Sequence, residues 1–170
     1  MAERATKIAP DDATTQKALG TVLAAEAEFD TAATAYRRAV ALDANAWGAM
    51  IELGDLAEIG GDQRAAIGYF EQAYAAMTRV YDTQAPRVRP WYAATGVLIG
   101  DRYARIGALD DAEAWYRRVL SQTPFQPEAT SGLANLLMRS GNKVEAVRLC
   151  NDLRDRTGAK ASCTSVPIKP

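Results

Sequence analysis

The sequence lacks most of the residue sets that enzymes use for catalysis. It contains no histidine, which excludes Ser-His-Asp triads, Cys-His pairs and histidine-ligated zinc sites. It has no glycine-rich phosphate loop and no Gly-x-Ser-x-Gly elbow. Its two cysteines, Cys150 and Cys163, do not have metal-site spacing. We therefore expect no enzymatic activity, no cofactor and no metal site.

Acidic side chains are plentiful, but their positions suggest a structural role. The acidic runs at residues 11–12 and 110–113, together with Asp62, precede or open segments of high helix preference. Negative charge at the start of a helix is stabilised by the helix dipole. These carboxylates are therefore interpreted as favourable charges at helix N-termini and not as catalytic groups.

Composition and charge describe an ordinary globular chain. The 170 residues are 48% hydrophobic and 24% charged, and no apolar run approaches the ~18 residues of a membrane span. A net charge of −1 gives no general electrostatic reason to bind nucleic acid or an anionic membrane. Residues 1–79 carry net charge −5 and residues 80–170 carry +4. That asymmetry could steer a charged partner or favour head-to-tail stacking, or it is compositional drift.

Four copies of one pattern recur along the chain, 34 residues apart except for 46 between the second and third. Each copy has an apolar residue followed by Gly or Ala, then an alanine, then an aromatic residue that is a cysteine in the fourth copy, and finally a small or aliphatic residue. The copies are Leu19-Gly20, Ala32, Tyr36, Ala39; Leu53-Gly54, Ala66, Phe70, Ala73; Ile99-Gly100, Ala112, Tyr116, Val119; and Leu133-Ala134, Ala146, Cys150, Leu153.

This pattern predicts pairs of antiparallel helices. Small residues at both contact points let two helices approach closely, and the bulky residue fills the space between neighbouring pairs. Gly61, Gly107 and Gly141 are expected to end the first helices with a left-handed backbone. Pro124 is expected to stop the second helix of the third copy.

The period and pattern resemble the tetratricopeptide repeat (TPR) family over roughly residues 1 to 157. The resemblance implies an all-α solenoid of antiparallel helix pairs in a right-handed superhelix. The family's early tryptophan is missing from all four copies. The four repeats are expected at residues 13–46, 47–92, 93–126 and 127–157. Residues 1–12 are expected to be a remnant of a preceding repeat or an N-terminal cap. Residues 158–170 are expected to form a tail that could cap the last repeat.

An insertion lies within the second copy, at residues 78–91. We expect the second helix to run to about Thr83, followed by a short loop and a lengthened helix that begins at Pro90. Arg87, Arg89, Trp91 and Tyr92 crowd this segment together with Tyr81. Aromatic residues here either cover the lengthened helices or form a contact surface, and both alternatives remain open.

The resemblance also implies a peptide-binding groove lined by the first helix of each repeat. The corresponding positions are Lys17 and Thr21; Ile51, Glu52, Asp55 and Glu58; Val97, Leu98, Asp101 and Arg105; and Asn135 and Arg139. Some members of the family hold the C-terminal carboxylate of a partner with a clamp of five residues. Only Lys17 matches that clamp here, so a C-terminal carboxylate is not the expected ligand. Glu52, Asp55, Glu58 and Asp101 are expected to lie close together, which suits a basic or amphipathic peptide, or they form a merely solvated face.

The leading functional hypothesis is a bacterial-type, non-catalytic scaffold or adaptor that binds a peptide or helix of another protein. The first alternative is an accessory array cut from a larger enzyme or from a secretion or assembly protein. The second is a structural repeat that associates with itself. Neither nucleic acid nor direct membrane insertion is expected.

Cys150 and Cys163 are hypothesised to form a disulfide. From Gly158, the helix back to Cys150 covers roughly 12 Å, and five extended residues reach at most about 17 Å. A tail that reverses at Gly158 therefore brings the two cysteines within bonding range. A bridge would imply an oxidising compartment such as the periplasm, and two unbridged thiols would suit the cytoplasm.

Overall fold

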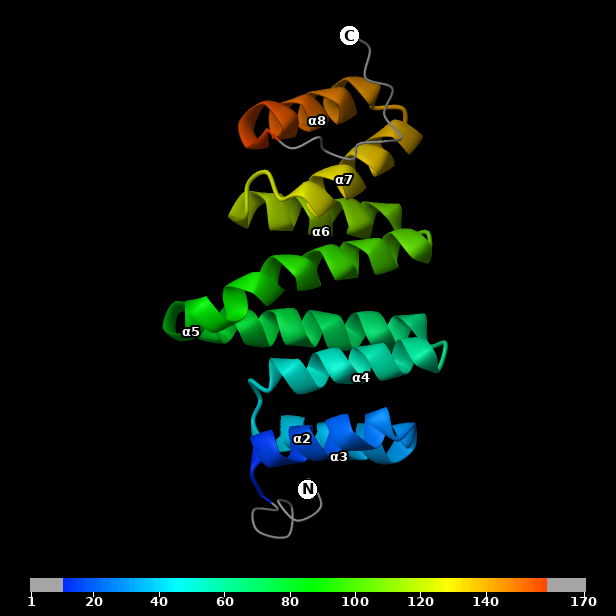
Figure 1. Ribbon diagram of the computed structural model, residues 1–170. Coiled ribbons are helices and arrows are strands. Elements are labelled where there is room, and N and C mark those ends of the chain that lie inside the picture. The colour runs from blue at the N-terminus through cyan, green and yellow to red at the C-terminus, as the bar shows by residue number, and fades with distance from the viewer. Residues whose placement is uncertain (1–10, 159–170) are drawn as a thin grey trace. The chain divides into compact units, whose positions relative to one another are not determined.

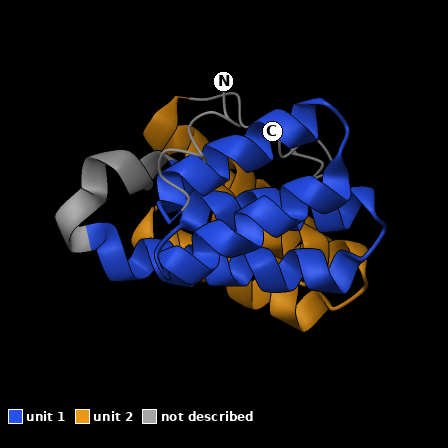
Figure 2. Ribbon diagram, turned by 90° about the horizontal axis from the view of Figure 1, so that it is seen from below, with its two compact units in different colours: residues 1–92 blue, residues 93–170 orange. Residues whose placement is uncertain are grey.

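The computed structural model describes residues 11–158, and for residues 82–90 it describes the backbone alone. Every regular element in that range is an α-helix (Figure 1). The helices are α2 (Ala13–Ala25), α3 (Phe29–Leu42), α4 (Trp47–Ile59), α5 (Gln63–Arg105), α6 (Leu109–Gln122), α7 (Pro127–Arg139) and α8 (Lys143–Thr157). The described chain divides between Tyr92 and Ala93 into two compact units (Figure 2).

Three-residue turns join the helices of a pair, and the middle residue of each turn has a left-handed backbone. Gly61, Gly107 and Gly141 have φ values of 81°, 82° and 91°, which confirms the predicted helix ends. The first copy uses Ala27 at the same place, with φ of 61°. A side chain makes that conformation costly, so the turn geometry is imposed by the helices on either side.

In the first unit, α3 packs against both α2 and α4. Tyr36 is fully buried, and a Cβ atom on Gly20 would lie 2.6 Å from its ring. Phe70 is also fully buried, and its ring occupies the space that a side chain on Gly54 would need. Glycine is therefore required at both positions by the close approach of the two helices.

In the second unit, the same arrangement surrounds Tyr116. Cβ atoms on Gly100 and Gly132 would lie 2.7 and 2.5 Å from its ring, so the ring fits between two glycines. Ala112, Leu133, Leu137 and further apolar side chains complete this core. As predicted, α6 ends before Pro124.

The predicted loop and the predicted new helix start at Pro90 are wrong, because helical backbone continues through Gln63–Arg105. The chain nevertheless turns back within the first unit. A straight helix would separate Tyr74 from Tyr92 by about 27 Å, but their ring centroids lie 4.3 Å apart. The centroids of Tyr81 and Tyr92 are 5.3 Å apart. Pro86 and Pro90 lie between these tyrosines, and proline is a common cause of a sharp helix bend.

The predicted disulfide involves one described residue. Cys150 is buried in the core of the second unit, as its place in the repeat predicts, and Gly158 ends α8 with φ of 63°. Cys163 and the other residues from 159 onward lie outside the described residues, as do residues 1–10.

The glycine contacts predict opposite effects for two alanine substitutions. Gly54→Ala should lower the free energy of unfolding by about 1–3 kcal/mol, because the methyl group would overlap the Phe70 ring. Gly68→Ala is the matched control, since a methyl group there would meet no atom within 4 Å. Alanine favours the helix, so the control should raise the free energy of unfolding by about 0.5–1 kcal/mol. Urea unfolding followed by circular dichroism measures both, and shifts of the same sign would contradict the packing argument.

Removal of a buried aromatic ring should lower the free energy of unfolding more than the Gly54→Ala substitution does. Phe70→Ala and Tyr116→Ala should each lower the free energy of unfolding by about 3–5 kcal/mol, because each leaves a cavity next to a glycine that cannot fill it. The same urea titration measures the loss. A value below about 1 kcal/mol for either variant would show that the ring does not hold the helices together.

The disulfide prediction is tested by thiol titration. Protein made in an oxidising compartment and denatured without reductant should show no free thiol if Cys150 and Cys163 are bridged. Prior reduction should restore two thiols, which serves as the control. Two free thiols before reduction would end the hypothesis.

Candidate protein-binding site

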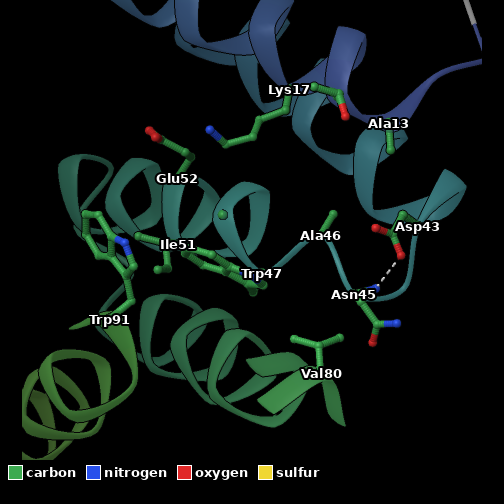
Figure 3. Close-up of a pocket in the computed structure, with 12 residues that line it drawn as sticks. Ala13, Lys17, Asp43, Asn45, Ala46, Trp47, Ile51, Glu52, Val80 and Trp91 are labelled. Carbon is green, nitrogen blue, oxygen red and sulfur yellow. Dashed lines mark hydrogen bonds between the residues drawn. The ribbon is translucent and has the colours of Figure 1, made fainter. Parts of the chain in front are cut away.

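A hollow of about 660 Å³ lies in the first unit, against the first helices of copies one and two (Figure 3). It is formed by α2, the connection from α3 to α4, the first turns of α4, and two residues of α5. The lining residues are Ala13, Thr14, Lys17, Asp43, Asn45, Ala46, Trp47, Gly48, Ile51, Glu52, Val80 and Trp91.

The spacing of α4 places its contribution to the hollow on one face. Trp47 and Ile51 are four residues apart and therefore lie on the same side of the helix. Gly48 makes room for a side chain from α2, since a Cβ atom there would lie 2.9 Å from Cε of Lys17. The aliphatic stem of Lys17 thus lies over the first turn of α4, opposite the two apolar side chains.

Two tryptophans form the aromatic part of the hollow. The ring centroids of Trp47 and Trp91 lie 6.1 Å apart at an interplanar angle of 42°. Trp91 is 52% exposed, although it is one of the largest apolar side chains in the protein. Its neighbour Tyr92 is buried against Tyr74, and the Tyr92 hydroxyl accepts a hydrogen bond from the Thr78 hydroxyl at 3.3 Å. Trp91 is therefore a surface residue, whereas Tyr92 belongs to the core.

The rim of the hollow is held by polar contacts. The side chain of Arg79 donates hydrogen bonds to Oδ1 of Asn45 at 2.9 Å and to the carbonyl of Ala44 at 2.7 Å. The backbone N–H of Asn45 donates to Oδ1 of Asp43 at 2.8 Å. These bonds fix the connection between α3 and α4, so the position of Trp47 at the start of α4 is fixed as well.

Glu52 lines the hollow and also contacts a core residue, Tyr36. Its Oε2 atom lies 3.4 Å from the Tyr36 hydroxyl, which donates to it and also contacts Oγ1 of Thr21 at 3.4 Å. Burial raises the pKa of Tyr36, and the negative charges of Glu52 and Asp55 act in the same direction. The phenol of Tyr36 is therefore a neutral hydrogen-bond donor at physiological pH.

The structure brings together some of the predicted groove residues of the first unit. Lys17, Ile51 and Glu52 line the hollow. Thr21, Asp55 and Glu58 do not line it, and the first two are exposed.

The predicted groove residues of the second unit have mixed environments. Val97 is buried in the core and offers little surface to a ligand, and Leu98 is half-buried. The Tyr116 hydroxyl donates to Oδ1 of Asp101 at 2.5 Å, and burial and this bond together raise the pKa of Tyr116. Arg105, Asn135 and Arg139 are exposed. Asp101 belongs to the second unit and the three acidic residues of α4 to the first, so their proximity stays a prediction.

Sequence reasoning missed Asp43, Asn45, Trp47 and Val80 as lining residues. A helical wheel of α4 could have found Trp47, because it lies four residues before the predicted groove residue Ile51. The pairing of Trp47 with Trp91 depends on the reversal inside α5, which the sequence pattern does not specify. The side chains of Arg87 and Arg89, the other residues of the alternative surface, are outside the described part.

The described residues include neither a metal-ligating cluster nor a membrane-spanning helix. There, no group of three His, Cys, Asp or Glu side chains could hold a metal ion. None of the described helices has the length and apolar character needed to cross a membrane. Two of the carboxylates expected at helix starts cap their helices: Asp12 accepts from the Thr15 N–H at 2.6 Å and Asp62 from the Ala65 N–H at 2.9 Å. The hydrogen bonds from the Thr15 hydroxyl and N–H lower the pKa of Asp12.

Comparisons with known proteins agree with the helix pairs. The chain superposes on the crystal structure of MamA with a TM-score of 0.71 at 21% identity, covering 91% of this chain and 83% of that one. It superposes on PilF of Pseudomonas aeruginosa with a TM-score of 0.68, also at 21% identity, covering 94% and 67%. At these identities the likeness establishes the fold alone.

A curated relative shares sequence with part of the chain. Cellulose synthase operon protein C of Pseudomonas fluorescens (strain SBW25) is 36% identical over 86 residues, which are 51% of this chain and 7% of that protein. The chain thus spans a small part of the length of that relative. The sequence profile of the tetratricopeptide repeat matches residues 17–78 and 97–161, which is most of the chain. With its glycine, alanine and aromatic positions in the observed helix pairs, the chain belongs to the tetratricopeptide repeat family.

Proposed function

We propose that this chain is a non-catalytic protein-interaction module that binds a peptide or helix of another protein in the hollow lined by Trp47, Ile51 and Trp91. The observation that carries the proposal is a pair of tryptophans, half-buried Trp47 and exposed Trp91, inside a hollow of about 660 Å³. Stacked helix pairs commonly present such extended surfaces to protein partners.

The apolar part of the hollow suits a large side chain of the partner. Tryptophan is enriched among the residues that dominate binding energy at protein interfaces, above all where its neighbours exclude water. Trp47 is half-buried and its connection to α3 is hydrogen-bonded, so the ring is held in place before a ligand arrives. A preformed surface lowers the entropy cost of binding.

The charged part of the hollow suits a partner with a basic side chain. Asp43 and Glu52 line the hollow together with a single lysine, Lys17, so its formal charge is negative. An Arg or Lys side chain that stacks on Trp91 would gain a cation–π contact as well as attraction to Glu52. Such an interaction weakens with added salt.

A second candidate function is an accessory array that presents partners within a larger protein or assembly. The match to 86 residues of cellulose synthase operon protein C supports it, because there the similar segment is part of a much longer chain. Binding through the hollow is compatible with this alternative. Self-association, the third hypothesis, would instead place a second copy of the chain on one of these surfaces.

The proposal predicts that binding depends on Trp91 and Glu52. Peptides selected from a random display library on the immobilised chain should lose at least about tenfold in affinity with Trp91→Ala, because the apolar anchor is removed. Glu52→Lys should weaken basic peptides to a similar extent and reduce the salt dependence of their binding. Fluorescence anisotropy of the labelled peptides measures both.

Two control variants lie outside the hollow. Trp115→Ala removes a tryptophan of the second unit that contacts Arg118, and Asp55→Lys reverses a charge one turn beyond Glu52 on α4. Both should change affinity by less than about threefold. A library that yields no binder, or peptides that bind Trp91→Ala as tightly as the unmodified chain, would refute the proposed site.

A further inference from the structure

A second hollow, of about 600 Å³, lies in the first unit between α3, the end of α4 and the start of α5. It shares no lining residue with the hollow described above. Leu53, Leu56 and Tyr69 form much of its apolar wall. Phe29 and Ile59, also lining residues, are 41% and 64% exposed.

The repeat register allows a direct comparison with the second unit, because copies three and four follow copies one and two by 80 residues. Arg37 of α3 corresponds to Arg117 of α6. Arg117 forms two ion pairs, with Glu113 Oε1 at 2.8 Å and with Glu145 Oε1 at 2.9 Å. The second pair connects α6 to α8.

In the first unit both carboxylates are replaced by alanine. Ala33 and Ala65 take the positions of Glu113 and Glu145, and both line the hollow. Arg37 also lines it and is exposed, and among residues 11–81 and 91–158 its side chain has no hydrogen-bond or ion-pair partner. The first unit thus keeps the arginine of the second but lacks both of its acidic partners.

Two other acidic residues line the hollow, and neither substitutes for the missing pair. Asp62 caps α5, since its Oδ1 accepts from the Ala65 N–H at 2.9 Å. Asp30 lies in the first turn of α3, and the second unit has an aspartate, Asp110, at the corresponding position in addition to its two ion pairs. The unmatched feature of the hollow is therefore the guanidinium of Arg37 beside an apolar wall.

We propose that this hollow is a second docking surface, which takes a segment of a partner protein with a carboxylate between apolar side chains. The carboxylate binds the guanidinium of Arg37, in the role that Glu113 and Glu145 have toward Arg117. Arginine is well suited to this role because its planar fork can donate two parallel hydrogen bonds to one carboxylate. The flanking apolar side chains cover Phe29, Leu56 and Ile59. Asp30 and Asp62 also line this hollow, so its preference for a carboxylate rests on the guanidinium of Arg37 and not on the net charge of the lining. The two hollows share no lining residue, so one chain can hold two different partners.

The test uses two capped peptides, acetyl-Leu-Glu-Leu-Leu-amide and its Leu-Gln-Leu-Leu counterpart, and ¹H–¹⁵N NMR titration of the whole chain. The Glu peptide should produce saturable shifts of the Ala33 and Ala65 amides and of the Arg37 Nε–H. The Gln peptide should bind at least about fivefold more weakly. Equal affinities, shifts confined to other residues, or no saturable shift up to about 10 mM peptide would overturn the proposal.

Three variants distinguish the site from a general charge effect. Ala33→Glu/Ala65→Glu rebuilds the ion pairs of the second unit around Arg37 and should abolish binding of the Glu peptide while the circular dichroism spectrum is unchanged. Arg37→Gln should remove the preference for Glu over Gln. Arg38→Gln, the control, changes the adjacent arginine, which pairs with Asp11 at 2.7 Å, and should leave both affinities unchanged.

Sedimentation of the chain without peptide tests whether a second copy of the chain occupies the hollow. A concentration-dependent dimer that disappears in Ala33→Glu/Ala65→Glu would identify a second copy of the chain as the occupant and would overturn the assignment to another protein. A chain that stays monomeric while it binds the Glu peptide supports the proposal.

Discussion

The contact between an aromatic ring and a glycine of an adjacent helix is the constraint on which the other features depend. Tyr36 lies against Gly20, Phe70 against Gly54, and Tyr116 against both Gly100 and Gly132. Because interiors are close-packed, a ring in direct contact with backbone fixes both the distance between the helices and the rotation of each about its own axis. The outward-facing side chains of α2, α4 and α7 are therefore set by a buried contact. The hollow at Trp91 can be preformed because this packing does not depend on the ligand.

The tyrosine hydroxyls extend the same constraint to the surface. The hydroxyl of Tyr36 reaches Thr21 and Glu52, and that of Tyr116 reaches Asp101. Thr21 and Asp101 each follow the glycine that contacts the ring, so the two hydrogen bonds are equivalent in the repeat. Phe70 has no hydroxyl and therefore cannot form this bond to the equivalent residue, Asp55. Positions that the family uses for ligands therefore also orient core rings here. A charge change at Glu52 acts on a core ring as well as on a ligand.

The sequence predicts most of the fold because the determining residues recur at a fixed interval. Gly61, Gly107 and Gly141 could be placed at helix ends from this spacing, and Pro124 beyond one. Ala27 could not, since alanine does not favour the left-handed backbone that the neighbouring helices impose on it. The site was less predictable for a related reason. Lys17, Ile51 and Glu52 follow from the register, whereas the contact of Trp47 with Trp91 arises from a reversal inside α5 that falls outside the repeat.

The outer positions of the repeat are under a weaker constraint than the inner ones. Ion pairs between exposed side chains contribute about 0–1 kcal/mol each, far less than a buried ring. Alanine in place of the two glutamates, as at Ala33 and Ala65, therefore has little effect on stability. It leaves the guanidinium of Arg37 exposed beside apolar side chains. The glycine–ring contacts, by contrast, admit almost no substitution. A repeat scaffold of this kind can acquire different surfaces in successive copies because the residues that hold the helices together are not the residues that face outward.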